Sequence, residues 1–273
     1  MTGTTRLTPA LDDRDHADAV ARLDAAARSG TPCPPVRDLL GATDLNRAYA
    51  VQQELGRLRT SRGARVIGRK IGLTAAAVQR QLGVDQPDFG VLYDDMACGA
   101  SVAIERLLQP KIEAEVAFVL AEDLVEGPFD PARMVAAIEY AVPALEIVDS
   151  RVAGWDISIV DTIADNASSG LFVLGPERVA LAGYAPVDSI MVMTINGDVV
   201  SEGTGAACLG DPLAALAWLA RTALELGDPL LQGQVVLSGA LGPMVPVVAG
   251  DNVVATISGL GTVSTRFTRS EES

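Results

Sequence analysis

Histidine is almost missing from the sequence, which contains a single one, His16, among 273 residues. A Ser-His-Asp or Cys-His catalytic arrangement would have to recruit His16, and a zinc site built on several histidines cannot be assembled. His16 lies in a charged, alanine-rich stretch, where a solvent-facing helical position is the simpler interpretation. The composition therefore excludes most histidine-dependent chemistry.

Cysteine and basic residues are also scarce. The three cysteines, Cys33, Cys98 and Cys208, are an odd number without a CxxC motif, so we expect neither a disulfide framework nor a cysteine metal site. Lysine and arginine total 21 against 35 aspartates and glutamates, a formal net charge of -14 at pH 7. This charge repels a phosphate backbone, and no basic run interleaved with aromatics offsets it. Nucleic acid is therefore not an expected partner.

The sequence also lacks long apolar runs. No window approaches the roughly 18 uninterrupted apolar residues of a membrane-spanning helix. The N-terminal stretch MTGTTRLTPALDDRDHADAV has neither the basic region nor the apolar region of a secretory signal. We expect a cytoplasmic protein that does not associate with membranes.

What the sequence does contain is a 49% share of hydrophobic residues, enough to bury a large core. Residues 1–63 are predicted to form a mainly helical N-terminal region. Its helices are expected over 13–28 and 43–62, the second with Thr43 as its N-cap. Residues 64–273 then form a β-rich domain.

Short β-rich runs dominate this second region, with helices predicted at 131–140 and 212–226 between them. The runs are VIGRKIG, KIEAEVAFVL, PALEIVDS, GLFVLG, SIMVMTI, VVLSGAL and VVATISG. Asn196-Gly197 is typical of a two-residue hairpin turn, and GLG at 259–261 indicates a second hairpin. Scattered strands with few helices predict an α+β fold whose mostly antiparallel sheet curls around a core.

Two glutamates stand two residues apart in the strand-like segment 111–120. Glu113 and Glu115 would share one face of the strand, while both faces are substantially apolar. Ionised carboxylates in such a place repel each other and lose hydration, so they require protonation, basic partners or a cation. A third carboxylate, Glu146, lies in the apolar run VPALEIVD.

If the two strands are neighbours, the three carboxylates could converge on a hard cation such as Mg²⁺ or Mn²⁺, with positions left for water and a chelating substrate. Glu-x-Glu also occurs by chance on solvated strand faces, and the spacing alone does not choose between these interpretations.

Two glycine-rich segments miss known nucleotide motifs. GARVIGRK at 63–70 has the glycine spacing of a phosphate loop, but Arg69 and Lys70 stand where the motif needs Lys and then Ser or Thr. In GTGAACLG at 203–210 the glycines miss the dinucleotide-binding spacing. We expect no nucleotide site.

Lys70 and the segment 161–170 leave alternatives open. Lys70 lies between Gly68 and Gly72, which let a ligand or another backbone approach closely, but an edge-strand lysine that discourages aggregation is the simpler interpretation. DTIADNASSG at 161–170 is polar enough for a loop, but a turn with a helix cap is the simpler interpretation.

Six motifs occur in order along the chain: VIGRKIGLT, VDQPDFGVL, QPKIEAEVAF, PALEIVDSRVAGWDISIVDTIADNASSGLFVLG, GTGAACLGDPLAALAWLA and VVLSGALGPMVPVVAGD. Their combination, from about residue 45 to the C-terminus, closely resembles the 2-keto-4-pentenoate hydratases of the fumarylacetoacetate hydrolase superfamily. The resemblance implies a curled, mixed β-sheet of roll or barrel type. It also implies a hydro-lyase of the meta-cleavage pathway for aromatic or steroid rings, converting a 2-hydroxyalka-2,4-dienoate to a 4-hydroxy-2-oxoalkanoate.

The resemblance also implies roles for six residues. Glu113, Glu115 and Glu146 would hold a divalent metal, Mg²⁺ or Mn²⁺, that stabilises the enolate of a 2-oxo acid. Three further residues would lie near the substrate: Lys70 of KIGLT as a source of positive charge or a proton, Asp88 of QPDFG as a proton shuttle or water-orienting group, and Ser168 of DNAS as an orienting hydrogen bond.

Other functions within the same superfamily remain alternatives. Hydrolysis of an acylpyruvate is disfavoured, because the related hydrolases use a histidine-assisted water and this chain has only His16. A 4-oxalocrotonate decarboxylase is the closer alternative, because its sequence is similar through Glu-x-Glu and DNAS. The resemblance further implies a homo-oligomer that associates with a pathway enzyme. Intact Lys70 and glutamates argue against a catalytically idle partner subunit.

Overall fold

Three helices precede the first strand in the computed structural model, which describes residues 13–75, 79–80 and 84–269. They are α1 (Asp13–Ser29), α2 (Arg37–Leu40) and α3 (Leu45–Ser61). Both predicted N-terminal helices are confirmed, but Thr43 as the N-cap of the second is wrong. The cap is Asp44, whose side chain accepts a hydrogen bond from the backbone N–H of Arg47.

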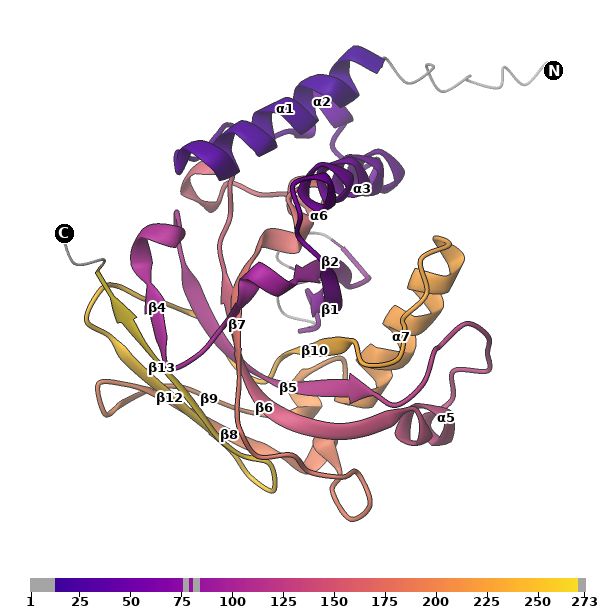
Figure 1. The fold of residues 1–273 in the computed structure, drawn as a ribbon, viewed down its shortest axis with the longest axis vertical. Coiled ribbons are helices and arrows are strands. Elements are labelled where there is room, and N and C mark those ends of the chain that lie inside the picture. Colours follow the sequence, from indigo (N-terminus) through magenta and orange to yellow (C-terminus); the bar gives the residue numbers. More distant parts are fainter. Residues whose placement is uncertain (1–12, 76–78, 81–83, 270–273) are drawn as a thin grey trace.

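The N-terminal helices pack against a later helix, α6 (Ile159–Ala164), at one end of the molecule (Figure 1). Leu23 of α1, Val51 of α3 and Ile163 of α6 belong to one buried apolar cluster. The cluster stabilises α6, which is too short to be stable alone.

Eight strands form the larger sheet, in the order β2-β1-β10-β5-β6-β7-β3, with β11 paired to β5. The strands are β1 (Val66–Gly72), β2 (Asp88–Tyr93), β3 (Ala97–Cys98), β5 (Lys111–Leu120), β6 (Ile138–Val148), β7 (Ser169–Leu174), β10 (Val235–Ala240) and β11 (Val245–Pro246). The β1–β10 and β3–β7 pairs are parallel and the others antiparallel. The sheet is therefore mixed and mostly antiparallel.

A second sheet of five strands, in the order β4-β13-β12-β8-β9, lies beside the first (Figure 1). Its strands are β4 (Ser101–Ala103), β8 (Ile190–Ile195), β9 (Asp198–Thr204), β12 (Asn252–Ile257) and β13 (Gly261–Thr268). Both predicted hairpins are confirmed. Asn196 and Gly197 have φ of 54° and 94° in the turn between β8 and β9, and Gly261 pairs with Ile257 across the other turn.

The α+β class and the curled sheet are confirmed, while one further local prediction is wrong. The helix predicted over 131–140 ends early: α5 (Pro131–Ala136) is followed directly by β6, because Ile138 pairs with Leu120 of β5. In the segment 161–170 the preferred turn with a helix cap is confirmed: Asp161 forms a capping box with Ser158 at the start of α6, and Asn166–Ser168 form a turn before β7. The helix predicted over 212–226 is confirmed as α7 (Pro212–Glu225).

Short 3-10 turns connect several of these elements. They are η1 (Asp94–Met96), η2 (Ile104–Arg106), η3 (Ala153–Trp155), η4 (Asn166–Ser168), η5 (Pro186–Asp188) and η6 (Gly205–Ala207).

The main core joins the two sheets. Phe118 and Phe172 of the larger sheet and Phe267 of the smaller one are almost fully buried in one apolar cluster. Among the described residues, no helix combines the length and apolar character that a bilayer crossing requires.

Candidate active site

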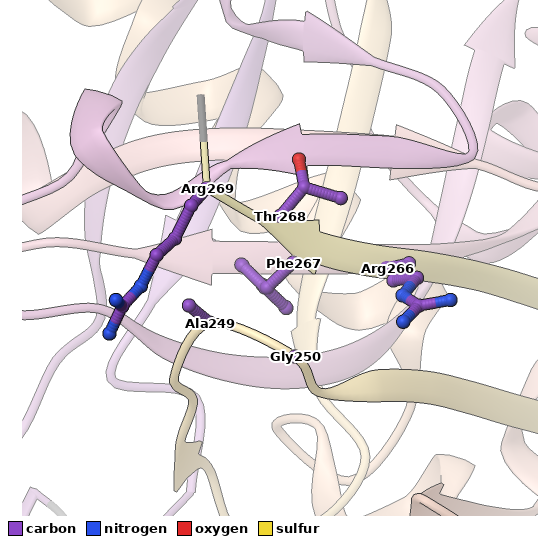
Figure 2. A pocket seen from close by; sticks show the side chains of 6 residues that line it. All are labelled: Ala249, Gly250, Arg266, Phe267, Thr268 and Arg269. Atoms are coloured by element: carbon purple, nitrogen blue, oxygen red, sulfur yellow. The ribbon is translucent and has the colours of Figure 1, made fainter. Parts of the chain in front are cut away.

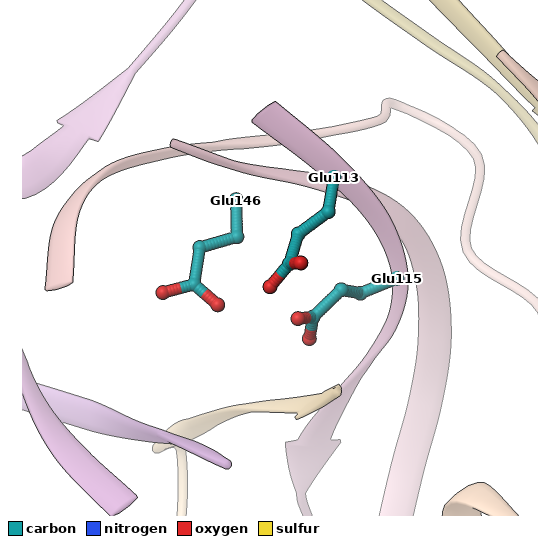
Figure 3. A group of neighbouring side chains, drawn as sticks. All are labelled: Glu113, Glu115 and Glu146. Atoms are coloured by element: carbon teal, nitrogen blue, oxygen red, sulfur yellow. The ribbon is translucent and has the colours of Figure 1, made fainter. Parts of the chain in front are cut away.

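Three carboxylates converge on the larger sheet (Figure 3). Glu113 and Glu115 lie two residues apart on β5, and Glu146 lies on β6 directly opposite Glu113 in the strand register. One oxygen from each side chain lies within 4.8 Å of the other two. Glu115 and Glu146 are buried and Glu113 is the most exposed of the three. The predicted convergence of the three glutamates is therefore present.

Burial and mutual repulsion make this group electrostatically unfavourable without a partner. Burial raises the pKa of Glu113 to about 7, the charge of Glu146 adds to the shift, and Lys70 opposes it. Burial likewise raises the pKa of Glu115 well above its usual range, with further contributions from Glu146 and Glu113. The site thus favours protonation or a compensating cation.

The donor set fits a hard divalent cation. Glu115 Oε2 accepts a hydrogen bond from the backbone N–H of Gly239 at 2.7 Å. Glu115 Oε1 and Glu146 Oε2 are buried and have no hydrogen-bond partner within the described ranges. Orphaned buried carboxylate oxygens are costly, and oxygen ligands of this kind suit Mg²⁺, Mn²⁺ or Ca²⁺.

Lys70 lies beside the carboxylates, with its Nζ 3.1 Å from Glu146 Oε1. It is only 3% exposed, and β1 is an interior strand between β2 and β10, so the edge-strand interpretation is wrong. Burial acts to lower the pKa of Lys70, but the charges of Glu146, Asp88 and Glu113 outweigh it and raise the pKa. Lys70 therefore stays protonated and places a positive charge next to the glutamates.

Asp88 and Ser168 meet through Thr162. The Thr162 hydroxyl donates to Asp88 Oδ2 at 3.3 Å and lies 3.4 Å from the Ser168 hydroxyl. Asp88 Oδ1 is buried without a hydrogen-bond partner in the described structure. Burial raises the pKa of Asp88 to about 6, against the opposing charge of Lys70. A carboxyl with this pKa can exchange protons near neutral pH.

The glycines around Lys70 allow close approaches. A Cβ on Gly72 would lie 2.3 Å from Asp88 Oδ1, and one on Gly68 would lie 2.0 Å from the backbone oxygen of Val235. Glycine is therefore needed at both positions, at one for the Asp88 carboxyl and at the other for β10.

Two contributions were missed by the sequence reasoning. Thr162 stands within the polar segment 161–170 but gave no signal of its own, because its link to Asp88 joins residues 74 positions apart. The backbone N–H of Gly239 carries no side-chain signature at all. Both become visible only when β2, α6 and β10 are brought together.

Other features of the described chain lie outside this group. His16 is a partly exposed residue of α1, and the three cysteines are free thiols. The neighbour of Lys70, Arg69, pairs instead with Asp228. The side chains in Figure 2 surround a hollow that lies away from the glutamates. Its volume is about 460 Å³. It is lined by Ala249, Gly250, Arg266, Phe267, Thr268 and Arg269. None of the described residues that line it carries a carboxylate, so this lining does not suit a cation.

Comparison with known proteins identifies the superfamily and the family to which the chain belongs. The sequence pattern of the family described as fumarylacetoacetate (FAA) hydrolase C-terminal matches residues 75–268, so the chain belongs to the fumarylacetoacetate hydrolase superfamily. Within it, the chain belongs to the 2-keto-4-pentenoate hydratase family. It is 52% identical to 2-keto-4-pentenoate hydratase 2 of Dechloromonas aromatica over 251 residues, 91% of this chain and 96% of the relative.

Two further similar proteins are named for two different activities, a hydratase and a decarboxylase. A 2-hydroxyhexa-2,4-dienoate hydratase of Comamonas testosteroni is 43% identical over 251 residues, covering 90% of this chain and 95% of the relative. The structure of 4-oxalocrotonate decarboxylase from Pseudomonas putida, complexed with magnesium and adipate, superposes with a TM-score of 0.89 at 33% identity. That similarity covers 97% of this chain and 100% of the decarboxylase chain.

Proposed function

We propose that this protein is a metal-dependent hydratase that adds water to a 2-hydroxyalka-2,4-dienoate and forms a 4-hydroxy-2-oxoalkanoate. The observation that carries the proposal is the convergence of Glu113, Glu115 and Glu146 next to buried Lys70. Relatives that share about half of the residues over nine tenths of the chain are named hydratases, which supports this reaction. The reaction belongs to meta-cleavage degradation of aromatic or steroid rings.

The three glutamates would hold a divalent cation, Mg²⁺ or Mn²⁺. When bound, the cation would supply Lewis-acid chemistry to the carboxylate and adjacent oxygen of the substrate. The magnesium complex of the decarboxylase supports a divalent ion in this fold. Carboxylate ligands accept both ions, so the choice between them depends on availability.

Lys70 and Asp88 would manage the charge and the protons of the reaction. In the first stage, the dienol gives up its hydroxyl proton and its terminal carbon gains a proton, which leaves a 2-oxo-3-enoate. The Lys70 ammonium would stabilise the negative charge that develops on the oxygen during this step. Asp88, with a pKa of about 6, would carry the proton between oxygen and carbon.

Water then adds to the conjugated alkene, its hydroxyl to carbon 4 and its proton to carbon 3. Asp88 would orient this water through its unpartnered Oδ1, and Ser168 would form an orienting hydrogen bond with the substrate. Thr162 lies between Asp88 and Ser168 and keeps the two groups in one geometry. Each proton is returned, so no oxidant or reductant is consumed.

Decarboxylation of a 2-oxo-3-enedioate is the second candidate, because the decarboxylase structure matches the whole fold. Its identity of 33% is well below the 43 to 54% of the relatives named hydratases, which favours hydration. Both reactions would use the same carboxylates and Lys70. They differ in whether the substrate gains water or loses CO₂.

The deciding experiment follows the ultraviolet absorbance of freshly generated 2-hydroxypenta-2,4-dienoate and identifies the product by mass. We expect gain of one water with Mg²⁺, and loss of this turnover with EDTA or in Glu113→Gln. No turnover of the dienoate together with CO₂ release from 2-oxohex-3-enedioate would replace the hydratase assignment by the decarboxylase. Turnover that persists in EDTA would show that the reaction does not require a metal.

Membership in the 2-keto-4-pentenoate hydratase family supports a cytoplasmic homo-oligomer that associates with a pathway enzyme. This location and assembly are part of the proposal. Light scattering of the purified protein tests the assembly, and a monomer at micromolar concentration would contradict it.

A further inference from the structure

Ser168 stands at the end of an unusual left-handed turn. Asn166, Ala167 and Ser168 have φ values of 54°, 52° and 52°, three consecutive non-glycine residues in a region that L-amino acids avoid. Such a run persists only where surrounding contacts hold it. The turn follows α6 and leads directly into β7.

The side chain of Asn166 binds the turn to the strand that carries Asp88. Its Oδ1 accepts from the backbone N–H of Val91 at 2.7 Å, and its Nδ2 donates to the backbone oxygen of Val91 at 2.9 Å. Because β2 is the edge strand of the larger sheet, the amide supplies the donor and acceptor that a neighbouring strand would offer. Asparagine has both groups at this reach, whereas aspartate lacks the donor.

The backbone of β2 is shaped to accept this contact. A Cβ on Gly90 would lie 2.3 Å from the backbone oxygen of Asn166 and 2.5 Å from the Ser169 hydroxyl. The Ser169 hydroxyl in turn donates to the Asn166 oxygen at 2.7 Å. Glycine at position 90 therefore lets the turn lie directly against β2.

An ion pair ties the two ends of the turn together. The Arg151 guanidinium donates to the backbone oxygens of Asp165 and Ser169, at 2.6 and 2.7 Å, and pairs with the Asp165 carboxylate. The backbone N–H of Asp149 also donates to the Ser168 oxygen at 2.8 Å. The turn is thus closed from behind, while Asn166 docks it on β2.

We propose that Asn166 is a positioning residue, which holds Ser168 at the separation from Asp88 that Thr162 bridges. It acts through Ser168 and does not itself contact the substrate. This inference rests on the proposed function, because it assigns Asn166 to the same reaction. It makes Ser168 dependent on a contact with β2 that lies outside the group of reacting side chains.

The test is a double-mutant cycle of Asn166→Asp and Ser168→Ala, run on whichever reaction the wild-type protein catalyses. Asn166→Asp keeps the side-chain shape and places an oxygen against the Val91 oxygen. We expect kcat to fall at least about tenfold with KM changed less than about threefold. Mg²⁺ affinity by calorimetry should equal that of wild type, because the glutamates are not touched.

Non-additivity is the result that a general structural role would not produce. If Asn166 acts through Ser168, the double variant should be within about threefold of Ser168→Ala alone. The inference would be overturned if the effects of the two single substitutions on kcat multiply in the double variant. Wild-type kcat in Asn166→Asp would overturn it as well. Wild-type turnover by Ser168→Ala would overturn it too, while leaving the hydratase assignment intact if the wild type still hydrates the dienoate.

A matched control is available in the other sheet. Asn196 has the same φ of 54°, and its amide accepts from the backbone N–H of Asn252 and donates to Asp251 in an exposed hairpin. Asn196→Asp should leave kcat unchanged.

If Asn166→Asp fails to fold, Gly90→Ala replaces it in the double-mutant cycle. The added Cβ displaces the turn from β2, while the Asn166 side chain stays unchanged. Additive effects of Gly90→Ala and Ser168→Ala would equally overturn the inference.

Discussion

At the scale of single residues, the site combines groups that are unfavourable one by one. Glu115 and Glu146 are buried with oxygens that have no hydrogen-bond partner in the described chain, and Lys70 is buried beside them. A buried charge is tolerated where it is paired or binds a cation. The residues are thus arranged for binding a charged ligand and not for stability.

Glu115→Gln tests whether Glu115 binds a metal or only stabilises the fold. The substitution keeps an oxygen for the Gly239 N–H but removes one charge from the converging carboxylates. We expect Mg²⁺ affinity, measured by calorimetry, to fall at least about 100-fold, while the melting temperature in EDTA does not decrease. The matched control is Glu139→Gln, an exposed glutamate of β6, which should change neither value. Unchanged Mg²⁺ affinity in Glu115→Gln would contradict the metal site.

Lys70→Met tests the role of the buried ammonium. Methionine keeps most of the side-chain length and removes the charge 3.1 Å from Glu146. We expect kcat to fall by about 100-fold or more, in the range of lost electrostatic stabilisation or proton transfer. Mg²⁺ affinity should stay equal or increase, because a cation is no longer repelled. Near-wild-type turnover would remove Lys70 from the mechanism.

At the scale of elements, one aspartate connects the start of α6 to the N-terminal helices. Asp161, fully buried, accepts hydrogen bonds from the backbone N–H groups of Val36 and Arg37 and pairs with the Arg37 guanidinium. It also forms the capping box of α6 with Ser158. Since α6 carries Thr162, this connection fixes part of the site.

Asp161→Asn should destabilise the protein in a manner that depends on pH. Burial acts to raise the pKa of Asp161, but hydrogen bonds from Ser158 and Arg37 outweigh it and lower the pKa below 3.8. A lowered folded-state pKa contributes stability above the unfolded value and loses it as pH falls through the folded value. We expect a loss of about 2 to 4 kcal/mol in the free energy of unfolding at pH 7.

Urea denaturation of wild type and Asp161→Asn at several pH values provides the measurement. The difference between the two proteins should be constant above pH 5 or so and shrink as the pH falls below about 4. A difference that does not change with pH would show that the charge of Asp161 is not what the substitution removes.

At the scale of the whole molecule, the site lies on the larger sheet, and its two halves come from different layers. The carboxylates come from β5 and β6, whereas Thr162 and Ser168 belong to the segment packed beneath α1–α3 (Figure 1). Assembly of the site therefore requires both the sheet and the helical layer, and a bound cation should stabilise the folded chain as a unit.

Addition of Mg²⁺ should raise the melting temperature. A ligand at about 100 times its dissociation constant adds about 2.7 kcal/mol to the free energy of unfolding, which corresponds to several degrees in a protein of this size. Scanning calorimetry with Mg²⁺ and with EDTA gives the shift, and Glu115→Gln should show none. Equal melting temperatures of the wild-type protein under both conditions would count against a resident cation.

The local features of this protein are determined by its sequence. The two-residue period of a strand places Glu113 and Glu115 on one face wherever that strand lies, and Asn196-Gly197 is a hairpin by its own backbone preferences. The single histidine disfavours histidine-assisted hydrolysis of an acylpyruvate. Such features depend on neighbours in the chain, so a short window contains the necessary information.

Only the tertiary structure decided which distant residues meet. Glu146 faces Glu113 because β5 and β6 pair in one register, and a shift by one residue would turn it to the other face. The Asp88–Thr162–Ser168 contacts and the docking of Asn166 on Val91 join segments about 75 residues apart. Register and docking are set by the summed packing of the whole core, which no local pattern encodes.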